Sequence, residues 1–293
     1  MRAAIAAESI GIPSVSIVCE GFEGQALATA RGHGHDGLAL AVTEGHVDAM
    51  STDELVVSFR ATVVDRVIAG LTVESAEGHD DDSGEPAALD IVVSGSIDDV
   101  NRYFLDRGWS EGHPVLPPTR ERIEAFLADS GHDPWKVLGV ASSSGRDVTV
   151  WSIAVNAVMA GCRPEHLPVL LALAEVLLDP AYGAEHSGNT TGADALIVLN
   201  GPKAATLGFH HGASVMREGA HANTAVGRWL RLYLRNVFGF TSDEHDKATF
   251  GNPARVVLSE DQACLDEIGW TPLSVDLGAP IGADTVSVAR MNS

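Results

Sequence analysis

A short acidic segment separates two parts of this chain that have different sequence patterns. Residues 74–89 read ESAEGHDDDSGEPAAL, rich in carboxylates and small residues and almost without large apolar side chains. Such a stretch buries too little apolar surface to fold, so it is typical of a linker or a solvated loop. A calcium-binding loop is the alternative, but Asp80–Asp82 lacks the alternating ligands and terminal Glu of an EF-hand. The sequence therefore predicts a partial α/β domain over 1–73, a linker over 74–89 and an α+β domain over 90–293.

The first part alternates short helical and β-rich runs. A longer helix is predicted from a cap at Ser51–Glu54 to about Gly70. Strands that alternate with helices favour a parallel α/β layer. Two strands are too few for a stable doubly wound sheet, so we expect an exposed edge that favours association. The predicted shorter helices are 2–9 and 22–31, and the predicted strands are Ser14–Cys19 and Leu38–Val42.

The second part mixes helices and strands without regular alternation, which favours an α+β fold. Its helices are predicted over Ile97–Asp106, from a cap at Thr119 to about Ser130, over Val148–Met159, from Cys162–Glu165 through Leu178, and over 223–238. Its strands are predicted over Ala195–Leu199, which ends in a turn at Asn200–Pro202, and over Arg255–Leu258 and Thr285–Val288.

Charge and cysteine content limit the partners and the compartment. The net charge is −21, from 19 Lys and Arg against 40 Asp and Glu. Nucleic acids and anionic membranes require a basic face, so both are disfavoured as partners. Three widely spaced cysteines without zinc-ligand spacing indicate reduced thiols in a cytoplasm. No window approaches the about 18 consecutive apolar residues of a membrane span, and we expect no signal peptide.

Several blocks of the sequence resemble one known family. They are similar to the C-terminal domain found with the UGSC family, selenoproteins named for a Sec-Gly-Ser-Cys motif, which is distantly similar to the selenocysteine-containing subunit of the glycine and betaine reductases. Residues 5–70, with GIPSVSIVCEGF, resemble the C-terminal half of the α/β domain of that family. The resemblance covers nearly the whole chain except the linker, and the block around Cys162 is its most specific part. The blocks are GWSEGHPVLPPT (108–119), VNAVMAGCRPEHLPVLLA (155–172), LNGP (199–202), ANTAVGRWLRL (222–232) and DKATFGNP (246–253).

The defining motif of that family is absent from this sequence. In the family, the Sec/Cys-Gly-Ser-Cys motif lies on a strand-to-helix turn just before the helix that residues 2–9 resemble. The resemblance therefore implies that a separate subunit supplies the redox pair, or that the true start lies upstream of Met1. Loss of the chemistry is the third alternative.

Cys162 and His166 form the predicted catalytic pair. Cys162 precedes a predicted helix and adjoins Arg163, and both features favour a thiolate. His166 lies four residues on, within reach as a proton acceptor or hydrogen-bond donor. The alternative is a buried cysteine at the start of a core helix.

A second group of residues is predicted to bind an anionic substrate. Arg228, Arg231 and Arg235 share one helix face, where ion pairing with carboxylates of this chain or of a partner is the alternative to binding a ligand. Asn223 adds a donor near the start of that helix. Lys247 lies in a block that matches the family, with a surface salt bridge as its alternative. Trp109 precedes the proline-rich run 112–119, which either walls a pocket or docks one domain on the other.

Other motifs are weaker. His210, His211 and His221, with His245 and Asp246, have no fixed metal-ligand spacing, and His33 and His35 lie in a glycine-rich turn where a third ligand cannot be named. Exposed loop histidines are the alternative in both places. GHGHDG (32–37) does not follow a strand and open a helix, and neither GxxxxGK[ST] nor GxSxG occurs.

The sequence thus predicts a thiol- or selenol-dependent enzyme or enzyme subunit of the oxidoreductase or lyase type. It would act on a small anionic organic molecule, with the redox Cys or Sec supplied by a partner or by an N-terminal extension. We expect no cofactor and no metal. The alternative is a non-catalytic structural or regulatory subunit. Both hypotheses predict a protein partner or a homo-oligomer.

Overall fold

The structure, a computed structural model, describes residues 2–8, 10–32, 37–45, 47–72, 89–184, 194–217, 219–241 and 257–291. The chain divides into two compact units. Unit 1 comprises residues 1–85 and 140–146, and unit 2 comprises residues 86–139 and 147–293. Nearly all of the predicted linker falls on residues 73–88, outside the described residues, so its role as a linker stays a prediction.

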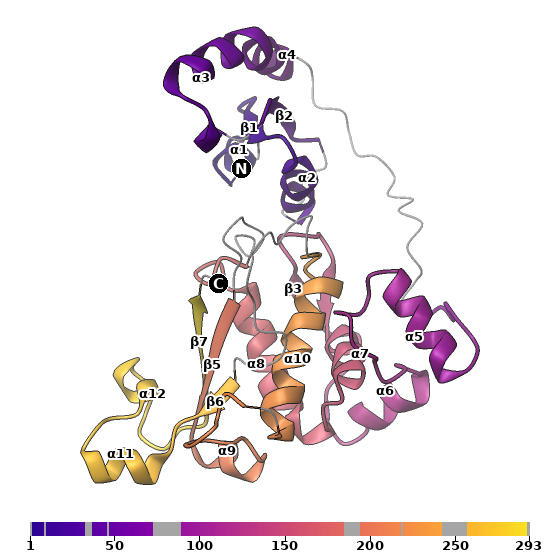
Figure 1. The fold of residues 1–293 in the computed structure, drawn as a ribbon, viewed down its shortest axis with the longest axis vertical. Helices are drawn as coiled ribbons and strands as arrows, with labels where there is room; N and C mark the ends of the chain where they lie inside the picture. The colour runs from indigo at the N-terminus through magenta and orange to yellow at the C-terminus, as the bar shows by residue number, and fades with distance from the viewer. Residues whose placement is uncertain are drawn as a thin grey trace. The chain divides into compact units, whose positions relative to one another are not determined.

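Unit 1 contains a parallel two-stranded sheet with helices on both faces (Figure 1). Val15 pairs with Ala39 in the sheet, and both lie against Gly70 on one face. Side chains alternate between faces along a strand, so Leu40 lies on the other face, where it packs with Ile5. The elements of unit 1 are α1 (Arg2–Glu8), β1 (Val15–Cys19), α2 (Glu23–Gly32), β2 (Ala39–Thr43), the short turn Val47–Ala49, α3 (Thr52–Ser58), the π-helical turn η2 (Phe59–Val63) and α4 (Val64–Thr72).

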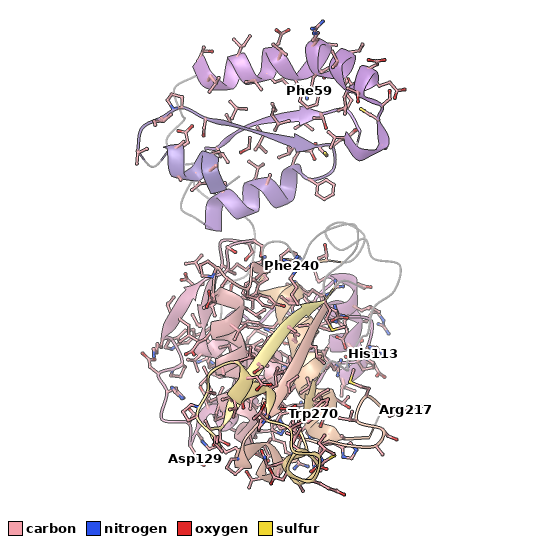
Figure 2. The ribbon with its side chains drawn as sticks, turned by 90° about the vertical axis from the view of Figure 1, so that its left-hand side faces the viewer. Phe59, His113, Asp129, Arg217, Phe240 and Trp270 are labelled. Carbon is pink, nitrogen blue, oxygen red and sulfur yellow. The ribbon has the colours of Figure 1, made fainter. Side chains whose placement is uncertain are left out.

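The long helix of unit 1 begins where the sequence predicted. The Ser51 hydroxyl accepts from the Glu54 backbone N–H, and the Glu54 carboxylate accepts from the Ser51 backbone N–H over 2.8 Å, which forms a capping box. The helix continues as α3, η2 and α4 to Thr72. Its π-helical turn places Phe59 toward the strands (Figure 2) and was not predicted.

Unit 2 contains a three-stranded mixed sheet in the order β6-β5-β7, in which β5 is parallel to β6 and antiparallel to β7. Its helices are α5 (Ile97–Asp106), α6 (Arg120–Leu127), α7 (Val150–Ala160), η3 (Pro164–His166), α8 (Leu167–Leu178), α9 (Pro202–Thr206), α10 (His221–Asn236), α11 (Gln262–Ile268) and α12 (Leu273–Asp276). Its strands are β5 (Asp194–Asn200), β6 (Val257–Ser259) and β7 (Thr285–Met291), and β3 (Val137–Val140) pairs with β4 (Asp147–Thr149) in a separate two-stranded sheet.

The core of unit 2 centres on the packing of α7 against α10. Trp229 and Tyr233 of α10 are fully buried and stack with ring centroids 4.6 Å apart. The indole N–H of Trp229 donates to the Ile153 carbonyl of α7 over 3.1 Å, so its one polar atom is satisfied inside the core. This rigid helix pair positions the segments that carry the candidate site.

The predicted fold class is confirmed: a partial parallel α/β segment precedes mixed α and β structure. Some details were wrong. The predicted helix over Val148–Met159 begins at Val150, because Val148 and Thr149 belong to β4, and Pro202 opens α9 instead of closing a turn. Strands β3 and β4 and helices α11 and α12 were not predicted, since they are too short for a periodic signal. Among the described residues, no helix is long and apolar enough to cross a membrane.

Candidate functional site

Cys162 is a buried thiol that follows α7. Gly161 ends the helix in the left-handed conformation, with φ of 81°, and the Cys162 backbone N–H donates to the Ala157 carbonyl over 2.9 Å. Burial strongly raises the pKa of the Cys162 thiol, while the nearby positive charge of Arg228 acts in the opposite direction with a smaller effect. Of the two alternatives that the sequence left open for Cys162, a thiolate at a helix start and a buried core cysteine, the burial and the raised pKa fit the second. The structure therefore holds a neutral thiol at this position.

His166 is also buried and is held by the backbone around it. Its Nδ1 accepts from the Arg163 backbone N–H over 3.2 Å, and a second hydrogen bond joins it to the Leu207 backbone. Desolvation lowers the pKa of His166, and nearby Glu165 partly offsets this. Among the hydrogen bonds of the described residues, none joins His166 to Cys162. His166 thus fixes the turn at η3, and its role as proton partner of Cys162 stays a prediction.

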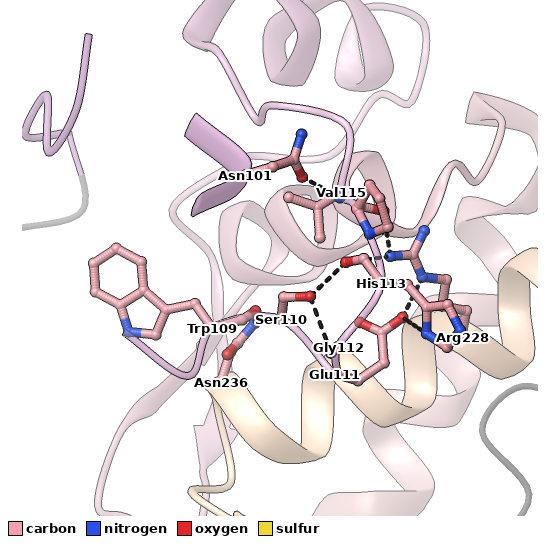
Figure 3. Close-up of polar contacts among 10 residues, drawn as sticks. Asn101, Trp109, Ser110, Glu111, Gly112, His113, Val115, Arg228 and Asn236 are labelled. Carbon is pink, nitrogen blue, oxygen red and sulfur yellow. Dashed lines mark hydrogen bonds and ion pairs between the residues drawn. The ribbon is translucent and has the colours of Figure 1, made fainter. Parts of the chain in front are cut away.

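Arg228 is anchored to the segment before α6 (Figure 3). Its Nε donates to Glu111 Oε1 over 2.5 Å, and its Nη2 donates to the carbonyl of Pro114 over 2.6 Å. His113 Nδ1 lies 3.4 Å from the same carboxylate oxygen of Glu111. The side chains of Arg228 and Glu111 are 19% and 10% exposed, so the pair is largely shielded from water. Glu111 Oε2 is buried without a hydrogen-bond partner. The site therefore contains a cation that is largely shielded from water and a carboxylate with one oxygen that can accept a further hydrogen bond. It also contains a neutral thiol whose pKa is affected by that cation.

The proline-rich segment 108–119 is fastened to unit 2 at several points. Asn236 of α10 donates to the Trp109 carbonyl over 3.1 Å, and the Val115 N–H donates to Asn101 of α5 over 2.6 Å. The Trp109 ring meets Phe104 edge to face, with centroids 5.4 Å apart. These contacts lie within unit 2, so the segment docks on its own unit. Docking of one domain on the other by this segment stays a prediction.

The other predicted anion-binding side chains also have internal partners. Arg231 donates to Asp194 of β5 over 2.5 Å, and Arg235 donates to the Gly108 carbonyl over 3.1 Å. The amide of Asn223 accepts from the His210 N–H over 2.7 Å and donates to the Val257 carbonyl over 2.8 Å. Ion pairing within the chain, the alternative to ligand binding, therefore describes Arg228 and Arg231 in this structure.

Several predicted ligands fall on parts of the chain that the structure does not describe. Lys247, His245, Asp246, His33 and His35 lie outside the described residues. His211 pairs with Asp261 at 3.1 Å, and the His166 and His221 rings lie 5.9 Å apart. Within the described ranges, no three His, Cys, Asp or Glu side chains gather as a metal site.

Sequence reasoning missed Glu111 and His113, although both lie in the block GWSEGHPVLPPT that it quoted. The contact between Glu111 and Arg228 joins residues 117 positions apart. The neighbours of Glu111 are Ser110, Gly112 and His113, so no local pattern marks it as buried, and only the long-range contact with Arg228 does.

Comparison with known proteins gives a match for unit 1 alone. Residues 1–73 match the UGSC family. The UGSC match ends before the blocks around Cys162 and Arg228, so the expectation that the resemblance covers nearly the whole chain is supported only for its N-terminal part. The relation to the glycine and betaine reductases stays a prediction. No curated protein and no solved structure matches the chain.

Proposed function

We propose that this chain is a thiol- or selenol-dependent enzyme or enzyme subunit of the oxidoreductase or lyase type, whose redox-active Cys or Sec comes from a partner protein or from an N-terminal extension. The observation that carries the proposal is the match of residues 1–73 to the UGSC family. The Cys-Gly-Ser-Cys motif of that family is absent from the sequence, and burial keeps Cys162 in its neutral form. Both facts favour a nucleophile other than Cys162, supplied by a partner protein or by residues upstream of this sequence.

We assign the binding of a small anionic organic molecule to the surroundings of Arg228. Its guanidinium already holds one carboxylate, that of Glu111, in a largely buried setting. A substrate carboxylate that replaced Glu111 would find the same donors, on the arginine whose positive charge also acts on the Cys162 thiol. Arg231 and Asn223 would then position α10, since their polar atoms bond to Asp194 and to the backbone.

A non-catalytic structural or regulatory subunit is the second candidate. One observation favours it: the described arginine and asparagine side chains that were predicted to bind substrate all have partners inside the chain. In this case Glu111 and Arg228 only fasten the proline-rich segment to α10.

Alkylation of the three cysteines, followed by peptide mass spectrometry on the native chain over a pH series, tests the proposal. Cys264 is exposed and should react readily, whereas Cys162 should react only slowly, because its pKa is raised. Glu111→Gln leaves the charge of Arg228 without its counter-charge. The alkylation rate of Cys162 should then rise by about tenfold for each unit by which the pKa of the Cys162 thiol falls. Arg228→Met should lower the alkylation rate of Cys162, and Arg228→Lys should restore part of that rate.

Two outcomes would change the assignment. Fast alkylation of Cys162 below the ordinary cysteine pKa of about 8.5 would show that this chain has its own reactive thiol and needs no partner for it. If neither Glu111→Gln nor Arg228→Met changes the alkylation rate of Cys162, the structural subunit is favoured. Glu124→Gln, on the exposed side of α6, is the matched control and should leave the Cys162 rate unchanged.

A further inference from the structure

Residues 261–284, here called the C-terminal arm, connect β6 to β7 and contain α11 and α12 (Figure 1). Polar contacts fix the arm to the rest of unit 2. Glu260 Oε2 accepts from Asn200 Nδ2 over 2.6 Å and from the Leu273 N–H over 2.8 Å. Asp284 at the other end accepts from the Lys203 N–H over 2.8 Å. The arm is therefore held at both of its ends.

Further contacts hold the arm in place. Asp261 accepts from the N–H groups of Ala263 and Cys264 and caps α11, while its carboxylate pairs with His211. Gly201 lies so close to the arm that an added Cβ would come within 2.6 Å of the Ala283 carbonyl oxygen. A side chain does not fit in this space, so the base of the arm is closely packed against the end of β5.

Although the arm is anchored to unit 2, it exposes four large apolar side chains. Ile268 is 53% exposed, Trp270 71%, Leu277 68% and Ile281 86%. Figure 2 labels Trp270 in the yellow C-terminal part of unit 2. Single exposed apolar side chains are normal on a surface, but four large ones within fourteen residues of one anchored segment make this segment the candidate for contact with another apolar surface.

The arm's own charged residues are all acidic, and the described ion pairs reach it near its two ends, where Asp261 pairs with His211 and Asp284 with Lys203 at 3.6 Å. Between Arg255 and Arg290 the sequence contains no Lys, Arg or His, while Asp266, Glu267 and Asp276 are exposed on the arm. A second copy of this chain would bring the same carboxylates to the contact, and its net charge is −21. Residues 1–72 carry 9 Asp and Glu against 4 Lys and Arg, so unit 1 is no better match. Like charges across an interface are unfavourable, whereas Lys and Arg are complementary to this rim.

We propose that the C-terminal arm is the docking surface for a different protein, one that presents an apolar patch framed by Lys and Arg. Trp270 and Ile281 enter the apolar patch, and Asp266 and Glu267 face the basic rim. The inference rests on the arm alone and holds whether or not the chain belongs to a thiol-dependent enzyme.

The thiol of Cys264 on α11 is exposed and free, so its alkylation rate shows directly whether a bound molecule covers the arm. The probe is an amphipathic helical peptide of leucine and lysine, added to the full chain during alkylation. At a peptide concentration about ten times its Kd, Cys264 alkylation should slow about tenfold, since about nine-tenths of the arm is covered. Cys19 in unit 1 should keep its rate, and added salt should weaken the protection.

Matched variants separate this surface from general attraction to an acidic protein. The double variant Trp270→Ser/Ile281→Ser should lose the protection, and Asp266→Asn/Glu267→Gln should weaken it. Ile91→Ser, at a position 85% exposed outside the arm, and Glu124→Gln/Asp129→Asn on the α6 side should retain it.

Three results would overturn the proposal. The first is equal protection by a peptide of leucine and glutamate, and the second is equal loss of protection in the control variants. The third is a dimer in analytical ultracentrifugation that Trp270→Ser converts to monomer, because the arm would then bind a second copy.

Discussion

His166 and Cys162 lie four residues apart, and the sequence joined them as a thiol and its base. The structure instead gives each a separate environment that disfavours charge. Desolvation raises the pKa of Cys162 and lowers that of His166, so both stay neutral near pH 7. A thiolate–imidazolium pair needs the opposite shifts. At this scale the local sequence identified the right residue types, but burial decided their protonation.

Acidification should destabilise the fold through His166. Its pKa is lower in the folded than in the unfolded state, so the unfolded chain binds the proton more tightly. The stability contributed by neutral His166 is present above the unfolded-state pKa of about 6.5 and is lost as the pH falls below it, by at most about 1.4 kcal/mol per pH unit. Urea unfolding at pH 7.5 and 5.5 measures this loss.

His166→Asn keeps an acceptor for the Arg163 N–H but cannot be protonated. It should lose less stability than the unaltered chain over the same pH interval. An equal loss in both proteins would assign the pH dependence to other groups, such as carboxylates, and would contradict this role of His166.

At the scale of elements, two glycines in helices of unit 1 have opposite surroundings. Gly70 in α4 lies against β1 and β2, where an added Cβ would come within 2.7 Å of Val15 Cγ2 and 3.0 Å of Ala39 Cβ. Gly24 in α2 has open space around it. The sequence does not distinguish Gly70 from Gly24, and the distance between helix and sheet decides which of them is required.

Gly70→Ala should destabilise unit 1 by about 1–3 kcal/mol, because the added methyl group forces α4 away from the sheet and the gain in helix propensity is smaller than that cost. Gly24→Ala is the matched control and should stabilise α2 by up to about 1 kcal/mol. Thermal unfolding followed by circular dichroism measures both. Similar effects of the two variants would show that α4 is not closely packed on the sheet.

At the scale of the whole molecule, the two units have unequal cores. Unit 1 rests on a two-stranded parallel sheet and few buried side chains, among them Ile5, Ala30 and Val63. Unit 2 contains the fully buried Trp229 and Tyr233 between its helices. Parallel strands are stable mainly when both faces and both edges are covered, so the smaller unit should open more easily.

Hydrogen exchange on the full chain should reveal this difference. We expect the amides of β1 and β2 to exchange faster than those of β5, α7 and α10, because local opening follows the buried apolar contacts of each unit. The comparison is internal to one sample, so conditions are matched. Equal protection in the two sheets would mean that the units unfold together.

The sequence by itself determined features that depend on neighbouring residues. The cap at Ser51, the helix Ile97–Asp106 and the strand within Asp194–Asn200 follow from side chains a few positions apart, and each was predicted closely. Only the tertiary structure decided that Glu111 meets Arg228, that Asn223 binds the backbone of His210 and that Cys162 is neutral. These features depend on burial and on contacts between residues far apart in the chain, and a local pattern carries no information about either.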